Sequence, residues 1–112
     1  MAVAFVFSDA AGVTYLGTLS GKPGDQSFVN GISDHGVAVG WSGNLRAGNR
    51  AFIWNSEMGI QPLEGVLNQL GANIPSGVTL TTALAISADG STIAGVGTSG
   101  RQPITWLATF SR

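Results

Sequence analysis

Residues Ile32 to Trp54 read Ile-Ser-Asp-His-Gly, then Val-Ala-Val-Gly-Trp-Ser-Gly and, at the end, Arg-Ala-Phe-Ile-Trp. The pattern returns between Ile86 and Trp106 as Ile-Ser-Ala-Asp-Gly, Thr-Ile-Ala-Gly-Val-Gly and Gln-Pro-Ile-Thr-Trp. The first residues of the two copies are 54 positions apart and the last residues are 52 apart. A repeat of about 50 residues that holds several short strands is typical of kelch-like propeller blades. The sequence therefore predicts two copies of one β unit.

Turn-forming residues divide the rest of the chain into short apolar segments, which favours strands over helices. We expect an all-β fold of about nine short antiparallel strands that form two kelch-length propeller-type blades plus one flanking strand. The chain, 1–112, is expected to be a single repeat module. Its parts are a flanking strand at 2–7, a first blade at 13–54 and a second blade at 60–108. The nine expected strands are 2–7, 13–19, 28–33, 37–42, 50–54, 60–63, 80–87, 91–97 and 102–108.

Two local features refine this prediction. The insertion 64–79 interrupts the second unit. The segment Pro62–Leu70, which overlaps its start, has apolar residues at helical spacing, so one or two helical turns are expected there, ending at Gly71. The flanking strand contains Phe5-Val6-Phe7, which aligns with Phe52-Ile53-Trp54 and with Ile104-Thr105-Trp106. We therefore expect the flanking strand to pair with a strand of another blade or another chain.

Composition limits the classes of function. The chain has 44% hydrophobic residues, 10% charged residues and 17 glycines, which suits one domain of short strands and turns. The net charge is −1 and the five basic residues are scattered, which argues against nucleic acid and anionic membranes as partners. The absence of cysteine excludes disulfides and thiol chemistry. Met1–Phe7 is too short for a signal peptide or a membrane span, so an exported parent would carry its signal elsewhere.

Three runs of sequence follow one another along the chain: Leu16-Gly17-Thr18-Leu19-Ser20-Gly21, then Ile32–Gly40, and then Arg50-Ala51-Phe52-Ile53-Trp54. These runs resemble the motifs of the HAF repeat family, an extracellular repeat of bacteria. Arg50 stands where the family motif has histidine, and the last unit is similar to the terminal repeat of such proteins. The resemblance covers nearly the whole chain. It implies an exported, cell-surface or autotransporter-type repeat protein and does not imply a reaction.

The titratable candidates are interpreted as turn residues. His35 is the only histidine, lies beside Asp34 in an expected hairpin turn and has no partner at metal-ligand spacing. Asp34 and Asp89 occupy the same turn of successive units and could act as paired carboxylates. Aspartate is favoured in such turns because its side chain hydrogen-bonds nearby backbone, so turn formation is the preferred interpretation. No catalytic residue, cofactor site or metal site is predicted.

The tryptophans are the remaining candidates. Trp54 and Trp106 are interpreted as one repeat position, which predicts packing in the core or between blades. Trp41 has no tryptophan counterpart, since its aligned position holds Val96 or Gly97. Packing is the preferred interpretation of Trp41 too. A platform on which a sugar ring stacks is the alternative, and it makes Trp41 the single candidate ligand-binding residue.

Two blades cannot close a ring, because closed propellers have about four to eight. We therefore expect either a homo-oligomer or further blades from a longer chain. The predicted function is that of an extracellular or cell-surface β-repeat module with a structural or binding role, non-catalytic, that assembles through strand edges. One alternative is a small carbohydrate-binding lectin whose two-blade chains oligomerise into one propeller. Another is a fragment of a larger surface enzyme or of an autotransporter passenger.

Overall fold

The computed structural model describes residues 3–9, 12–44 and 48–110. These residues form nine strands and one short helix, all strand pairs are antiparallel, and the all-β prediction is confirmed. Each of the nine predicted strands overlaps one observed strand, in the same order along the chain. The elements are β1 Phe5–Ser8, β2 Gly12–Tyr15, β3 Gln26–Ile32, β4 Ala38–Asn44, β5 Gly48–Asn55, β6 Gly59–Pro62, α1 Leu63–Gln69, β7 Val78–Ile86, β8 Thr92–Ser99 and β9 Gln102–Thr109.

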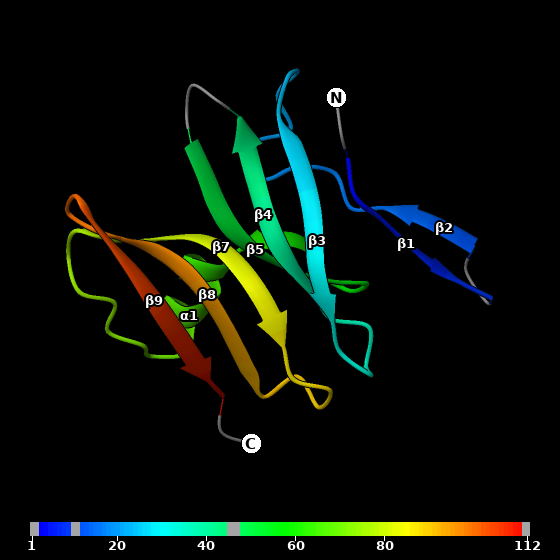
Figure 1. Ribbon diagram of the computed structural model, residues 1–112. Helices are drawn as coiled ribbons and strands as arrows, with labels where there is room; N and C mark the ends of the chain where they lie inside the picture. The colour runs from blue at the N-terminus through cyan, green and yellow to red at the C-terminus, as the bar shows by residue number, and fades with distance from the viewer. Residues whose placement is uncertain (1–2, 10–11, 45–47, 111–112) are drawn as a thin grey trace.

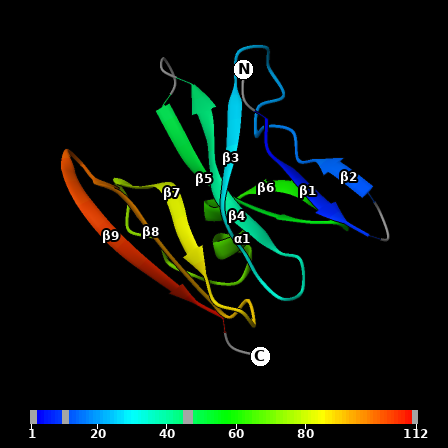
Figure 2. The ribbon, with the colours of Figure 1, turned by 45° about the vertical axis from the view of Figure 1, so that its right-hand side comes forward.

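The strands form three separate open sheets (Figure 1). Strands β1 and β2 form a two-stranded hairpin, β3-β4-β5-β6 form the central sheet, and β7-β8-β9 form the third sheet. The hairpin lies on one side of the central sheet and the third sheet on the other (Figure 1, Figure 2). The sheets thus divide the chain one strand later than the expected blades do, because β2 pairs with β1 and β6 joins the sheet of β3.

Side chains of the central sheet alternate between its two neighbours, as the two-residue period of a strand requires. Ala38 belongs to an apolar cluster shared with the hairpin, and the next residue, Val39, belongs to a cluster shared with the third sheet. On β5, Phe52 and Trp54 face the hairpin cluster, whereas Ala51 faces the other. Both clusters are closed by side chains that are nearly or fully inaccessible to solvent. The middle strands of the central sheet, β4 and β5, are therefore covered on both faces.

Helix α1 closes the cluster between the central and third sheets. It begins after Pro62, whose fixed φ of −65° leads into a helix, and it is followed by Gly71 at a φ of +89°. Leu63 and Leu67 lie one turn apart and are both buried in the cluster. The helix expected within Pro62–Leu70 and its end at Gly71 are confirmed.

The β1–β2 hairpin repeats the β5–β6 hairpin residue for residue. Phe7 lies opposite Val13 in the first, as Trp54 lies opposite Ile60 in the second. The pairs Ser8–Gly12 and Asn55–Gly59 follow, and both glycines have positive φ, 72° and 75°. Strand β1 is therefore equivalent to β5 and β2 to β6. The flanking strand expected at 2–7 is found as β1, Phe5–Ser8, and it pairs with β2, the first strand of the expected first blade; residue 2 lies outside the described residues.

The β3–β4 and β7–β8 pairs also repeat each other, including the same β-bulge. Val29 lies opposite Gly40, as Ala83 lies opposite Gly95, and both ladders shift register at the next residues. The central sheet is the only four-stranded sheet of the described residues, so we number the strand positions after it: β3 holds position 1, β4 position 2, β5 position 3 and β6 position 4. Strands β3 and β7 hold position 1, β4 and β8 position 2, β1, β5 and β9 position 3, and β2 and β6 position 4. The hairpin thus has positions 3 and 4, and the third sheet has positions 1 to 3.

The ladders correct one alignment made from the sequence. Phe52 lies opposite Gly40, and Trp106 lies opposite the equivalent Gly95. Trp106 is therefore equivalent to Phe52, and the equivalent of Trp54 is Ala108, which lies two residues further along β9. A shift of two keeps a side chain on the same face of a strand, so the predicted packing role holds for both tryptophans. Trp54 is 8% exposed and Trp106 packs against the other cluster.

Candidate functional site

Trp41 lies on β4 and stacks on Phe28 of β3. The two residues are direct cross-strand partners, and their ring centroids are 4.6 Å apart with an interplanar angle of 24°. Phe28 is 39% exposed, and Trp41 is half-buried. Cross-strand aromatic pairs stabilise a sheet beyond the area that they bury. The contact therefore gives Trp41 a packing role, and one face of its indole is already covered.

His35 lies in the β3–β4 turn, as predicted. The turn is fixed by Ser33, whose Oγ accepts hydrogen bonds from the backbone N–H groups of His35 at 3.3 Å and Val37 at 3.2 Å. His35 also lines a cavity of about 450 Å³ between this turn and the hairpin, together with Val6 and Trp54. On this face the central sheet is covered by the hairpin alone. The hairpin has strand positions 3 and 4 but not 1 and 2, and the cavity lies beside it.

Asp89 acts as the turn former that its sequence context predicts. Its Oδ1 accepts hydrogen bonds from Ser87 Oγ at 2.7 Å, from the Ser91 backbone N–H at 2.9 Å and from Ser91 Oγ at 2.7 Å. The turns that hold Asp34 and Asp89 also touch, because the Asp34 N–H donates to the Ala88 carbonyl at 2.7 Å. This bond joins equivalent turns of adjacent sheets.

Asp25 is a buried carboxylate that the sequence analysis did not single out. It is 8% exposed and accepts hydrogen bonds from Ser20 Oγ and Asn44 Nδ2, one on each oxygen. These two hydrogen bonds hold the pKa of Asp25 below its usual value, with a smaller contribution from Lys22. The carboxylate ties the loop between β2 and β3 to the end of β4. The only signal in the sequence was a lone aspartate at the end of a glycine-rich loop.

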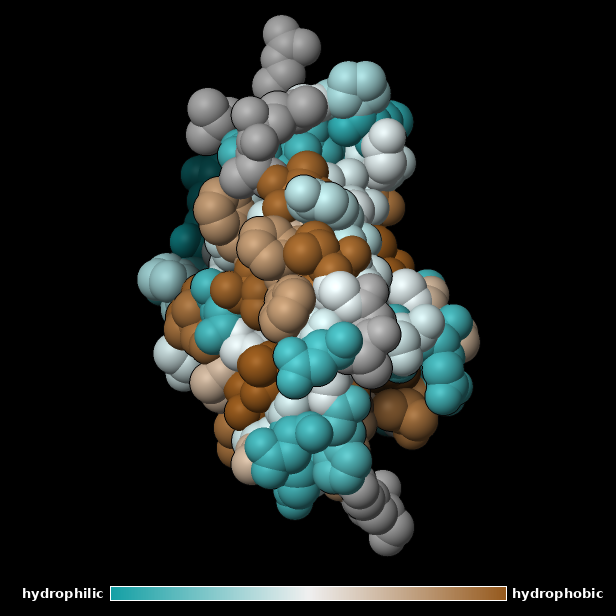
Figure 3. All heavy atoms as spheres, turned by 90° about the vertical axis from the view of Figure 1, so that its right-hand side faces the viewer, coloured by the Kyte–Doolittle hydropathy of each residue, from teal (hydrophilic) through white to brown (hydrophobic). Residues whose placement is uncertain are grey.

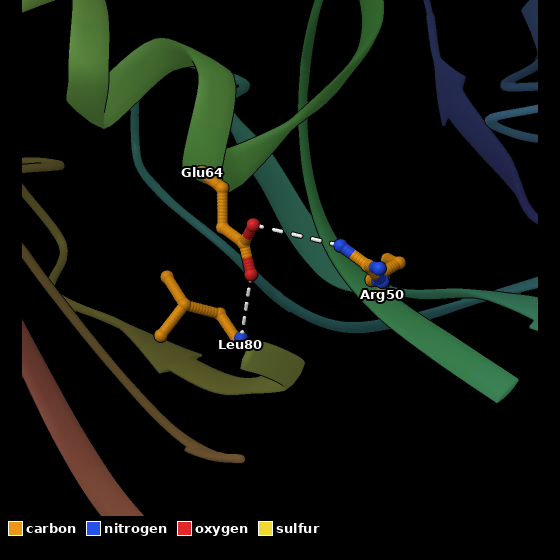
Figure 4. Close-up of polar contacts among 3 residues, drawn as sticks. All are labelled: Arg50, Glu64 and Leu80. Atoms are coloured by element: carbon orange, nitrogen blue, oxygen red, sulfur yellow. Dashed lines mark hydrogen bonds and ion pairs between the residues drawn. The ribbon is translucent and has the colours of Figure 1, made fainter. Parts of the chain in front are cut away.

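Glu64 joins three elements (Figure 4). Its Oε1 accepts the backbone N–H of Leu80 at 2.8 Å, and its Oε2 lies 3.5 Å from Nη1 of Arg50. Helix α1 is thereby linked to β7 and to β5. The buried environment of Leu80, which is 4% exposed, makes the first of these contacts the more consequential one.

The hydrogen bonds of Asp25, Glu64 and Asp89 link backbone segments to one another. Within residues 3–9, 12–44 and 48–110, no three histidine, aspartate or glutamate side chains are grouped so that they could hold a metal ion. In the same residues, no helix has the length and apolar character needed to cross a membrane.

A cavity of about 440 Å³ lies between the segment Ala72–Pro75 and β9, and its lining is mainly apolar.

The outer face of the hairpin carries an apolar patch (Figure 3). Phe5 pairs with Tyr15 and Phe7 with Val13 across the two strands, so the four side chains share one face. They are 56%, 69%, 64% and 51% exposed in that order. A contiguous exposed apolar patch is a candidate for contact with a partner. We call these four residues the hairpin face.

The third sheet has an exposed outer face as well as an unpaired edge. Leu107 on β9 is 69% exposed and lies on the face opposite to Trp106 and Ala108, which pack toward the central sheet. Within the described part of the chain, β9 pairs with β8 and has no strand on its other side. An exposed strand edge beside an exposed apolar side chain is a ready template for another strand.

Comparison with known proteins adds no family. No family model, curated protein or solved structure matches the chain. The candidate functional site is therefore defined by the structure alone, as the two outer faces and the free strand edges at the ends of the stack of sheets.

Proposed function

We propose that the protein is a non-catalytic β-repeat module of the propeller type, with a structural or binding role at the bacterial cell surface. In this proposal its sheets are blades, and its two outer faces receive further blades. The extracellular assignment rests on the resemblance to HAF repeats.

One observation carries the proposal: residues exposed at the ends of the stack are equivalent to residues buried in its centre. Phe5 and Phe7 are 56% and 64% exposed, while their equivalents Phe52 and Trp54 are 0% and 8% exposed. Leu107 is 69% exposed, whereas its equivalent Ile53 packs against the inner cluster. The sheet packing inside the molecule can therefore continue outward at both ends, as it does in repeat proteins.

Light scattering behind a sizing column tests the proposal. We expect the wild-type chain to form a discrete oligomer, and we expect Leu107→Ser to shift it toward monomer without lowering secondary structure, because Leu107 is exposed in the single chain. Arg101→Ser, an exposed change near the same strand, is the control and should leave the mass unchanged. A wild-type chain that stays monomeric and binds no apolar dye would contradict the proposal.

Glycan binding is the second candidate function, and the Phe28–Trp41 stack, in which Phe28 is 39% exposed and Trp41 half-buried, favours it. An aromatic pair on a sheet surface offers a flat apolar area on which a sugar ring can stack. A glycan array with wild-type protein and Trp41→Leu checks this function. Signals that Trp41→Leu abolishes would support it, and silence from a folded wild-type oligomer would rule it out.

A further inference from the structure

The strands at the two ends of the molecule complement each other. In the part of the chain that the structure describes, the third sheet has positions 1 to 3 and lacks position 4, and the hairpin supplies position 4 in β2. Within the described residues, position 3 is present twice at the ends, as β9 and as β1. We propose that copies of this chain associate head to tail by strand exchange, in which β9 of one copy replaces β1 beside β2 of the next. The inference rests on the proposed function, because it names the partner of the exposed faces.

The existing ladders fix the register of the exchanged pair. In the complete sheet, Ile53 of position 3 lies opposite Gln61 of position 4. The equivalent of Ile53 is Leu107, and the equivalent of Gln61 is Thr14. Leu107 of one copy is therefore placed opposite Thr14 of the next. The new sheet would then hold four strands, β7-β8-β9 and the β2 of the second copy.

The exchange buries side chains that the single chain exposes. Leu107 takes the place of Val6, which packs on the cluster of Phe52 and Trp54, and its exposure of 69% falls. Strand β1 is a weak competitor, because its place beside β2 leaves Phe5 and Phe7 more than half exposed. Burial of apolar surface is the main favourable term in such an association.

The exchange also covers the bare part of the central sheet. Ile32 on β3 is 50% exposed, whereas its equivalent Ile86 packs on the neighbouring sheet, where its Cγ2 lies within van der Waals reach of Gly31. The hairpin leaves Ile32 exposed because it lacks positions 1 and 2. Strands β7 and β8 of the incoming copy supply those positions and bring their turn to the cavity beside His35.

Engineered cysteines test the register on the full chain, which has no native cysteine. Leu107→Cys protein is mixed with Thr14→Cys protein under mild oxidation, and the disulfide-linked heterodimer is measured on a non-reducing gel. Directly opposite residues of antiparallel strands have Cα atoms about 4.5–5.5 Å apart, which a disulfide can span. The matched control is Thr105→Cys mixed with Thr14→Cys, two residues out of register on the same exposed face. We expect about tenfold more heterodimer from the first mixture, because the control pair lies beyond disulfide reach.

The outcomes separate this inference from the proposed function. An oligomer by light scattering with equal or absent cross-linking in both mixtures overturns strand exchange and leaves face-to-face assembly standing. Preferential cross-linking through Thr105 overturns the stated register. A monomeric wild-type chain overturns strand exchange, and it contradicts the proposed function as well only when it also binds no apolar dye. Removal of residues 1–8 gives an independent check, since strand exchange predicts tighter association without β1, and weaker association would count against it.

Discussion

Gly95→Ala should destabilise the protein strongly, because the indole of Trp106 and a backbone carbonyl occupy the space of the missing side chain. A Cβ built at Gly95 would lie 2.1 Å from the Thr82 carbonyl oxygen and 2.4 Å from Cζ2 of Trp106. Neither neighbour can yield freely. The carbonyl belongs to the bulged β7–β8 ladder, and the indole is held by its Nε1–H, which donates to the Val96 carbonyl at 2.7 Å.

The magnitude follows from these contacts. Overpacking costs about 1–3 kcal/mol, and loss of the indole hydrogen bond adds about 1 kcal/mol, so we expect a loss of roughly 2–4 kcal/mol of unfolding free energy. For a domain of this size, 1 kcal/mol corresponds to roughly 4 °C, which gives a fall of about 8–16 °C in the melting temperature.

Gly65→Ala is the matched control, because it makes the same chemical change in the helix. A Cβ at Gly65 would meet only Pro62 Cγ at 3.4 Å, which is ordinary contact. Alanine exceeds glycine in helix propensity, so we expect a gain of about 0.5–1 kcal/mol. Both variants are compared with the wild type by thermal and urea unfolding at one protein concentration. A Gly95→Ala melting temperature within about 2 °C of the wild type would refute the packing argument.

Three further predictions concern contacts inside the molecule, each measured by urea unfolding. Glu64→Gln should lower the free energy of unfolding by less than about 1 kcal/mol, since the Arg50 ion pair is partly exposed. Glu64→Ala should lower it by about 1–3 kcal/mol, because the Leu80 N–H loses its acceptor. Equal effects of the two variants would contradict this. Leu63→Ala should cost about 2–5 kcal/mol, because the side chain is fully buried, and a smaller loss would mean that α1 is not part of the core. The pKa of Asp25 is lowered in the folded protein, so its stabilising effect is complete above the unfolded pKa of about 3.9 and is lost as pH falls through the folded pKa. Asp25→Asn should therefore flatten the acid dependence of the unfolding free energy. An unchanged pH profile would refute this.

The strands were predictable because their signals are local. Turn residues and apolar alternation predicted nine strands, and helical spacing in Pro62–Leu70 predicted α1. The grouping of strands into sheets was not predictable from the repeat alone, since a repeat has no intrinsic first strand. Loop length decides it: β5 and β6 are joined by the tight turn 56–58, whereas the longer connections 16–25 and 63–77 separate the sheets.

The alignment of Trp54 with Trp106 failed because identical residues were preferred over constant spacing. Ile32 and Ile86 are 54 positions apart, and the same spacing pairs Phe52 with Trp106. The strand ladders agree with this spacing. The β7–β8 turn is one residue longer than the β3–β4 turn, and the β8–β9 connection is one residue shorter than the β4–β5 connection, so the two differences cancel. Glycine supplied an unused signal, because Gly40 and Gly95 both lie opposite an aromatic residue.

Burial was the property that the sequence could not give, and the reason bears on function. Phe7 and Trp54 are equivalent aromatic residues at the same strand position, yet one is 64% exposed and the other 8%. Trp54 is covered by the neighbouring hairpin, whereas no sheet of the described residues covers Phe7. No local sequence pattern encodes this difference. A residue that is core in the middle of a stack becomes interface at its end. The faces proposed to bind a partner are therefore made of residues of the core type, and an unusual side chain such as Trp41 does not mark them.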